Sequence, residues 1–161
     1  MTITASRYHD FSCGHRVHGH ENKCAQLHGH NYRVTFTLGR DNEQLDAIGR
    51  VLDFGIINTK LCQWLEKHWD HKFLAWRDDP LMSALVCALD GPEENTTQTQ
   101  REAMTMMRDS IVWLPFNPTA ENMAAFLLEW VGPDALHNTG AILLSVRIEE
   151  TRKCSADASL S

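Results

Sequence analysis

The sequence predicts an α+β fold in which an antiparallel sheet of four strands carries two main helices on one face. Two segments near the N-terminus, 2–17 and 28–38, alternate apolar and polar residues as strands do. Two later segments place apolar residues at helical spacing, and each begins at an N-cap residue. Two short apolar runs, 111–116 and 142–150, supply the other strands, so that the order is strand, strand, helix, insert, strand, helix, strand.

Composition narrows the class of protein. A chain of 161 residues with 43% hydrophobic and 22% charged residues suits one globular domain, 1–161. The net charge of -6 without a basic stripe argues against a nucleic-acid partner. No apolar run approaches the roughly 20 residues of a membrane helix, and the N-terminus has no apolar signal core. Five cysteines without a CxxC pair indicate a reducing compartment, so we expect a cytoplasmic protein.

The first two strands share a pattern that matters for function. In the first strand, Phe11, Cys13 and His15 lie on one face. In the second strand, one face carries His28, His30, Tyr32, Val34, Phe36 and Leu38. A polar segment, 18–26, joins the two strands as a loop. If the strands pair in antiparallel fashion, the end of the first meets the start of the second.

The first helix begins after Asp53, a plausible N-cap, and its apolar face carries Ile57, Leu61, Trp64, Leu65 and His68. The second follows Pro118, with Thr119 as the N-cap and Glu121 in the first turn. Its apolar face is predicted to comprise Met123, Phe126, Leu127, Trp130 and Val131. Gly132 and Pro133 are expected to end it.

Between these helices lies an insert at about 77–111, in which a polar loop, 91–100, is flanked by segments that could be helical. On the last strand the predicted apolar face carries Leu144, Val146 and Ile148. The final residues, about 152–161, are expected to be frayed.

Six of the nine histidines fall within the first thirty residues. His28 and His30 project from one face of their strand, and His15 lies beside them if the strands are antiparallel. Three neutral imidazoles on an inward face suit Zn²⁺, and a three-histidine site leaves one coordination position open. His18 and His20 repeat the HxH spacing, but they lie in a polar loop and are expected to be solvated.

Other candidates have two interpretations each. Cys24 is either a buried thiol or fourth zinc ligand, or a thiolate activated near a cation. Asp70 and His71 end the first helix, where a histidine is favoured by the helix dipole, or they form an acid–base pair. The residues alone favour the helix-end interpretation. Glu150 continues the apolar face of the last strand, so its carboxylate either turns to solvent or binds a ligand with paired N–H donors.

Six blocks occur in a characteristic order: FSCGHRV, ENKCAQLHGHNY, LDFG, WDHKFL, NPTAEN and a strand ending in EET. Together they resemble the family of 6-carboxy-tetrahydropterin and 6-pyruvoyl-tetrahydropterin synthases, from about Tyr8 to Thr151. The spacing of Cys24 from His28 and His30 is similar to that of the bacterial 6-carboxy branch, which belongs to queuosine biosynthesis. The insert is not covered by the resemblance.

The resemblance implies a tunnelling fold whose subunits join their sheets in trimers or hexamers. It implies that His15, His28 and His30 hold Zn²⁺ and that Cys24 moves a proton with Asp70 and His71 as partners. Glu150 is implied to anchor the pterin ring, and Thr119 and Glu121 to shape its site.

The implied reaction converts 7,8-dihydroneopterin triphosphate to 6-carboxy-tetrahydropterin, with release of triphosphate and acetaldehyde. Lys23, Arg16 and Arg33 are candidates for binding the phosphates. Two other functions remain open. One is a 6-pyruvoyl-tetrahydropterin synthase, which eliminates triphosphate without cleaving the side chain. The other is a non-catalytic zinc protein in which Cys24 closes the site.

Overall fold

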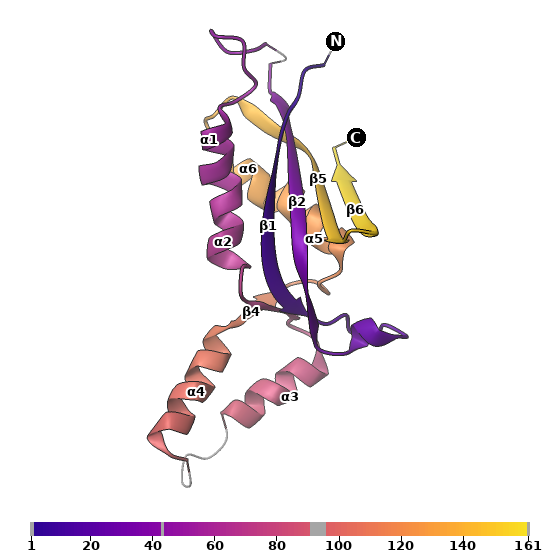
Figure 1. The fold of residues 1–161 in the computed structure, drawn as a ribbon, viewed down its shortest axis with the longest axis vertical. Helices are drawn as coiled ribbons and strands as arrows, with labels where there is room; N and C mark the ends of the chain where they lie inside the picture. Colours follow the sequence, from indigo (N-terminus) through magenta and orange to yellow (C-terminus); the bar gives the residue numbers. More distant parts are fainter. Residues whose placement is uncertain (1, 43, 91–95, 161) are drawn as a thin grey trace.

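The computed structural model describes residues 2–42, 44–90 and 96–160. Its strands form a mixed sheet in the order β4-β3-β1-β2-β5-β6 (Figure 1). The strands are β1 (Ala5–His15), β2 (His28–Arg40), β3 (Phe73–Trp76), β4 (Ile111–Leu114), β5 (Ala141–Thr151) and β6 (Cys154–Ser159). The predicted α+β class is confirmed, but the expected four antiparallel strands are six in the described residues, and β3 pairs in parallel with β1 and β4.

The hairpin of β1 and β2 has the predicted antiparallel register. Its pairs run from Ala5 opposite Leu38 to His15 opposite His28. Tyr32, Val34 and Phe36 are buried, as the alternation predicts, because their face of the sheet is covered by helices. The other face is open to solvent, where the guanidinium of Arg33 lies 4.2 Å from the centroid of the Tyr8 ring.

An irregularity in β5 corrects the predicted apolar face of this strand. Thr37 pairs with Ser145 but Leu38 pairs with Leu143, so Leu144 is an extra residue in the β5 strand. The bulge reverses the alternation, and Leu143 is buried in place of Leu144. From Val146 onward the predicted alternation holds, and Val146 and Ile148 are buried.

Two strands were not predicted. β3 has four residues without alternation and pairs in parallel, which removes the usual period-two signal. β6 occupies a segment expected to be frayed, and this expectation was wrong. Half of its residues are polar, as suits an edge strand, and hydrogen bonds to β5 hold it in place.

Two continuous helices cover the buried face of the sheet. The first consists of α1 (Phe54–Ile57), a π-helical turn (Asn58–Cys62) and α2 (Gln63–His68). The second consists of α5 (Ala120–Phe126), a π-helical turn (Leu127–Val131) and α6 (Gly132–Ala135). The predicted N-caps are confirmed, since Asp53 accepts from the Gly55 N–H and Thr119 from the Asn122 N–H. Both helices contribute to one core with Val34, Phe36 and Val146.

Two details of the second helix differ from the prediction. Gly132 and Pro133 do not end it, because the π-helical turn places Pro133 in the first turn of α6. At that position the backbone N–H that proline lacks is not needed. The same turn shifts the helix register, so Trp130 is 69% exposed while Leu127 and Val131 are buried.

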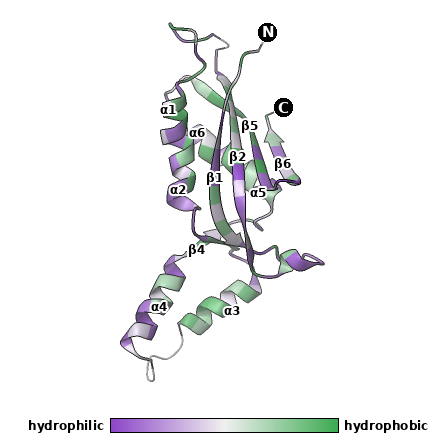
Figure 2. Cartoon of the chain, viewed as in Figure 1, coloured by the Kyte–Doolittle hydropathy of each residue, from purple (hydrophilic) through white to green (hydrophobic). Residues whose placement is uncertain are grey.

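The insert projects from the body as a helical hairpin of α3 (Pro80–Leu89) and α4 (Gln98–Asp109) (Figure 1). The helical flanks are confirmed, although the expected polar loop is shorter, because residues 98–100 begin α4 and residues 91–95 lie outside the description. Figure 2 shows that α3 is more apolar than α4. Within the described residues, no helix is both long and apolar enough to span a membrane.

Candidate active site

Three histidines meet where β1 ends and β2 begins. Because His15 pairs directly with His28 and His30 follows two residues later, all three rings lie together. The ring centroid of His15 is 4.4 Å from that of His28 and 5.3 Å from that of His30. One nitrogen from each ring lies within 4.8 Å of the others. The antiparallel pairing therefore produces the cluster that the sequence predicted.

Backbone carbonyls fix the orientation of two of these rings. Nδ1 of His15 lies 2.8 Å from the carbonyl oxygen of Pro118, and Nδ1 of His28 lies 2.8 Å from that of Gln26. A carbonyl can only accept, so each Nδ1 carries the proton and each Nε2 retains its lone pair. Histidines that bind a metal through one ring nitrogen commonly donate the other ring N–H to a carbonyl in this way.

The chemistry of the cluster suits a metal ion. Nε2 of His28 and of His30 is buried, and neither finds a hydrogen-bond partner among the described residues. Burial lowers the pKa of His15 and of His30, which favours the neutral form that binds metal. Among the described residues, no fourth side chain forms one ligand group with the three imidazoles, which matches an open zinc site. These residues could therefore hold a metal ion.

Glu150 reaches the same cluster from β5. Its Oε1 lies 3.4 Å from Nε2 of His15 and 3.6 Å from Nε2 of His30, and the hydroxyl of Tyr32 donates to it at 3.3 Å. The pairing of β5 with β6 shifts between Glu149 and Thr151, so Glu150 lies in an irregularity of the strand. Its side chain still follows the alternation of Val146 and Ile148, which places the carboxylate on the face of the sheet that carries the histidines.

Asp70 and His71 form a hydrogen-bonded pair. His71 donates from Nδ1 to Asp70 Oδ2 at 2.8 Å, and the Ser12 N–H donates to Asp70 Oδ1 at 2.9 Å. Partial burial acts to raise the pKa of Asp70, but these hydrogen bonds outweigh it and hold the pKa below its usual value. His71 has φ of 55°, a left-handed conformation that is unusual for this residue type.

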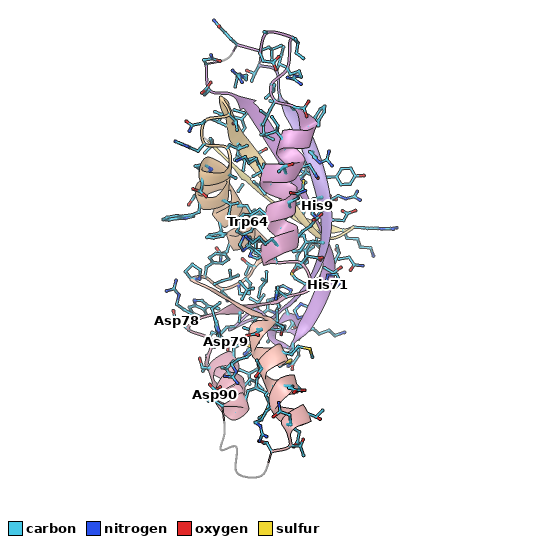
Figure 3. All side chains as sticks on the ribbon, turned by 90° about the vertical axis from the view of Figure 1, so that its left-hand side faces the viewer. His9, Trp64, His71, Asp78, Asp79 and Asp90 are labelled. Atoms are coloured by element: carbon cyan, nitrogen blue, oxygen red, sulfur yellow. The ribbon has the colours of Figure 1, made fainter. Side chains whose placement is uncertain are left out.

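A polar groove connects these groups. A depression of about 1150 Å³ is lined on one side by Asp70 and His71 and on the other by His30, Tyr32 and Glu150. A neighbouring depression is lined by His28, His30 and His71. The candidate proton-transfer pair and the histidine cluster therefore face the same open space. Figure 3 shows His71 beside the strands, just above the insert.

Cys24 lies in the loop between β1 and β2, in a short helical turn (Lys23–Ala25). Its thiol is half-buried, and its carbonyl accepts from the Val17 N–H at 2.8 Å. It is not part of the histidine cluster. Burial raises the pKa of Tyr32 above its usual value. The Cys24 thiol is among the groups that make smaller contributions to this shift through their charge.

Thr119 and Glu121, which the resemblance implies shape the pterin site, lie at the start of α5. Thr119 caps α5, and Glu121 is exposed in the first turn of that helix. Neither lines the groove that contains Glu150. Among the three candidates for binding phosphate, Arg16 is buried, Lys23 lies in the Cys24 loop and Arg33 makes two hydrogen bonds to Asp10.

Sequence reasoning missed three residues that organise the site. Tyr32 was assigned to the core, yet its hydroxyl lies 3.1 Å from Nε2 of His15. A buried tyrosine needs a partner for its hydroxyl, and this requirement was the available signal. Pro118 acts through its carbonyl, which no side-chain pattern reveals. Asn117 binds both the N–H and the carbonyl of His18, at 3.0 and 2.8 Å, and so clamps the loop.

Comparison with known proteins gives a consistent result. The chain is 31% identical to a 6-carboxy-5,6,7,8-tetrahydropterin synthase of Rickettsia typhi, over 94% of this chain and 96% of the relative. It is 34% identical to a probable 6-carboxy-5,6,7,8-tetrahydropterin synthase of Halobacterium salinarum, over 90% of this chain and 79% of the relative.

Solved structures have the same fold. An uncharacterized protein from Wolinella succinogenes matches with a TM-score of 0.83 at 25% identity, covering 100% of this chain and 99% of its own. The 6-pyruvoyl tetrahydropterin synthase of Caenorhabditis elegans matches with a TM-score of 0.62 at 21% identity, covering 100% and 97%. The latter similarity concerns the fold alone.

The sequence model described as 6-pyruvoyl tetrahydropterin synthase matches residues 4–160, which is nearly the whole chain. The order of motifs, the tunnelling fold and the curated relatives agree with this match. The chain therefore belongs to the 6-pyruvoyl tetrahydropterin synthase family, whose members include the 6-carboxy-tetrahydropterin synthases.

Proposed function

We propose that the protein is a zinc-dependent 6-carboxy-5,6,7,8-tetrahydropterin synthase that acts on 7,8-dihydroneopterin triphosphate. The observation that carries this proposal is the convergence of three histidine nitrogens beside a groove that also holds Asp70, His71 and Glu150. The names of the curated relatives support the same activity.

His15, His28 and His30 would hold the zinc ion through Nε2. The buried, unpartnered nitrogens of His28 and His30 support this assignment. When bound, the ion would supply Lewis-acid polarisation of the substrate's side-chain oxygens, which makes the neighbouring C–H bonds more acidic. Tyr32 would support the cluster indirectly, because its hydroxyl donates to Glu150, whose carboxylate lies beside the rings of His15 and His30.

Proton transfer is assigned to Cys24 and to the Asp70–His71 pair. Cys24, as a thiolate, would remove a proton from the substrate side chain. His71 would donate or accept the second proton, with its ring oriented by the 2.8 Å hydrogen bond to Asp70. The lowered pKa of Asp70 keeps this carboxylate charged, so that it supports a protonated imidazole.

Glu150 would bind the pterin ring. A carboxylate with one oxygen held by Tyr32 can accept paired N–H donors such as those on a pterin edge. Thr119 and Glu121 do not line the groove that contains Glu150, and they would shape the site only indirectly, from the start of α5 next to the Pro118 carbonyl that orients His15. Glu150 and His30 line one groove. Glu150 would therefore bind the pterin ring of a substrate whose side chain lies beside the metal.

Lys23 and Arg33 remain the candidates for binding triphosphate, because the guanidinium of Arg16 is buried in its pair with Asp79, whereas the pair of Arg33 with Asp10 is exposed. Loss of triphosphate and cleavage of the side chain, with uptake of one water molecule, give 6-carboxy-tetrahydropterin and acetaldehyde. We place this reaction in queuosine biosynthesis in the cytoplasm, and we expect a homo-oligomer, a trimer or hexamer.

A second candidate is the sister activity for which the family model is named, 6-pyruvoyl tetrahydropterin synthesis. It would use the same metal site and omit the cleavage that releases acetaldehyde. A non-catalytic zinc protein with Cys24 as the fourth ligand is less favoured, because Cys24 is not part of the histidine cluster.

The test is incubation of the zinc-loaded protein with 7,8-dihydroneopterin triphosphate, following pterin products and acetaldehyde together. Equal amounts of 6-carboxy-tetrahydropterin and acetaldehyde would support the proposal. A pyruvoyl product without acetaldehyde would establish the sister activity. Full zinc occupancy without turnover would overturn both enzymatic proposals.

A further inference from the structure

A buried ion pair joins the Cys24 loop to the base of the insert. Arg16 Nη1 donates to Asp79 Oδ1 at 2.8 Å, and the two residues are 8% and 1% exposed. Asp79 is the N-cap of α3, since its Oδ1 also accepts from the Leu81 N–H at 3.0 Å. Figure 3 places Asp79 at the junction between the insert and the body, and Asp90 at the other end of α3.

The other end of Arg16 holds the loop that carries Cys24. Arg16 Nε donates to the carbonyl of Ala25 at 3.0 Å, and the Val17 N–H donates to the carbonyl of Cys24 at 2.8 Å. Arg16 also follows directly after His15, the last residue of β1. The side chain of Arg16 therefore connects the cysteine loop to the insert, and its backbone continues directly from the histidine cluster.

A histidine and a tryptophan also lie beside the pair. His18 Nδ1 lies 3.8 Å from Asp79 Oδ1, and its ring lies 5.6 Å from that of Trp76, which ends β3. Separating a buried pair leaves an uncompensated charge on each partner. The free energy of the fold therefore strongly favours the observed contact between Arg16 and Asp79. Its guanidinium is consequently not free for the substrate's phosphates.

We propose that Arg16 and Asp79 are positioning residues, which fix the Cys24 thiol relative to the histidine cluster by bonding the loop to the N-terminus of α3. The insert is then part of the active-site framework and not only a surface decoration. The catalytic consequence rests on the function proposed above, whereas the placement of Cys24 does not. A displacement of about 1 Å in a reacting group can reduce a rate about a hundredfold, so a small movement of Ala25 would matter.

The test combines Asp79→Asn with the double variant Arg16→Met/Asp79→Asn. Asn retains an acceptor for the Leu81 N–H, and the double variant leaves no unpaired buried charge. Asp78→Asn is the matched control, because Asp78 is adjacent and exposed. Four quantities are measured: zinc content, kcat, KM with the pterin triphosphate, and the rate at which iodoacetamide alkylates Cys24, resolved by peptide mass spectrometry. Cys154, which is exposed, is the internal reference.

We expect the double variant to retain zinc and the alkylation rate of Cys154. The Cys24 rate should change at least about threefold, and kcat should fall about tenfold to a hundredfold with little change in KM. The control should match the wild type. A folded double variant with unchanged Cys24 reactivity and unchanged kcat would overturn the proposal, because a purely structural pair would alter only the unfolding temperature.

Two further outcomes are informative. If the wild type shows no turnover, the proposed function fails, but the ratio of Cys24 to Cys154 alkylation still decides the positioning role. If the double variant does not fold, Arg16→Lys decides it. Lysine retains the charge opposite Asp79 but has one nitrogen and cannot form the same fork, so the proposal requires an altered Cys24 rate in this variant as well.

Discussion

The imidazole of His15 lies 2.8 Å from the carbonyl oxygen of Pro118, a residue 103 positions later in the chain. This contact joins the histidine cluster to the start of the second helix. The preceding residue, Asn117, clamps the backbone of His18 through two hydrogen bonds. The NPTAEN segment therefore orients a candidate zinc ligand from outside the cluster.

Replacing Asn117 by Ala should weaken zinc binding without removing a ligand. Loss of the clamp lets the Pro118 carbonyl move, and outer-shell changes of this kind reduce metal affinity about tenfold to a hundredfold. Competition with a chromogenic chelator would measure the dissociation constant. Asn58→Ala is the matched control, because this variant removes a hydrogen bond that Arg7 donates to Asn58, outside the histidine cluster. Equal affinity in both variants would contradict the prediction.

His28→Ala should abolish stoichiometric zinc binding, because it removes one of three ligands from the cluster. His20→Ala provides the comparison. His20 belongs to an identical HxH spacing, but its ring accepts from the Asn22 N–H in an exposed loop. Metal content after exhaustive dialysis, measured by mass spectrometry of the element, should fall only in the first variant. A zinc ratio of one per chain in His28→Ala would show that another residue binds the ion.

Cys24→Ala should retain zinc and lose turnover, because the thiol is not part of the histidine cluster. Loss of a proton-transfer group reduces a rate by about 10²- to 10⁴-fold. Zinc content and product formation should be measured on the same preparation, with Cys154→Ala as the control for an exposed thiol. Loss of zinc in Cys24→Ala alone would identify the cysteine as a ligand and support the non-catalytic alternative.

Glu150→Gln should reduce kcat/KM about tenfold to a hundredfold, which is the usual effect of replacing one charged hydrogen-bond partner of a ligand. The amide oxygen can still accept from the Tyr32 hydroxyl, so the fold should be preserved. Glu149→Gln removes the same charge from the rim of the same groove and should have a much smaller effect. Similar losses in both variants would mean that overall charge, not binding by Glu150, controls the rate.

The histidine cluster could be predicted from the sequence because it depends on strand alternation and on the antiparallel pairing of two neighbouring strands. His15, His28 and His30 share a parity with Phe11 and Tyr32, and burial enforces that parity. Asp53 and Thr119 were also predictable, since capping is a local interaction.

Features that depend on distant parts of the chain could not be predicted. The bulge at Leu144 depends on the register with β2, and β6 depends on the edge that β5 offers. The pair between Arg16 and Asp79 joins the end of β1 to an insert, and nothing local to Arg16 indicates that it is buried. Long-range packing thus decided the surroundings of the site, while alternation decided its central residues.

His71 combines a candidate catalytic role with backbone strain, since its φ is 55°. Left-handed conformations cost a residue other than glycine up to about 1–2 kcal/mol, and such strain is commonly found at functional sites. His71→Gly should therefore abolish the pairing with Asp70 and reduce turnover, while the free energy of unfolding stays level or rises by up to about 1 kcal/mol. Chemical denaturation and product assays on the same variant would measure both effects.

Asn138→Gly is the matched control for this prediction. Asn138 has φ of 63° and does not line the groove of Glu150 and His71, so relief of its strain should leave turnover unchanged. Asparagine tolerates this conformation better than most residues, and its gain in stability should be small. A marked loss of stability in His71→Gly would mean that the hydrogen bond to Asp70 outweighs the strain. The pair would then support the fold, and the left-handed backbone would give no separate argument for a catalytic role.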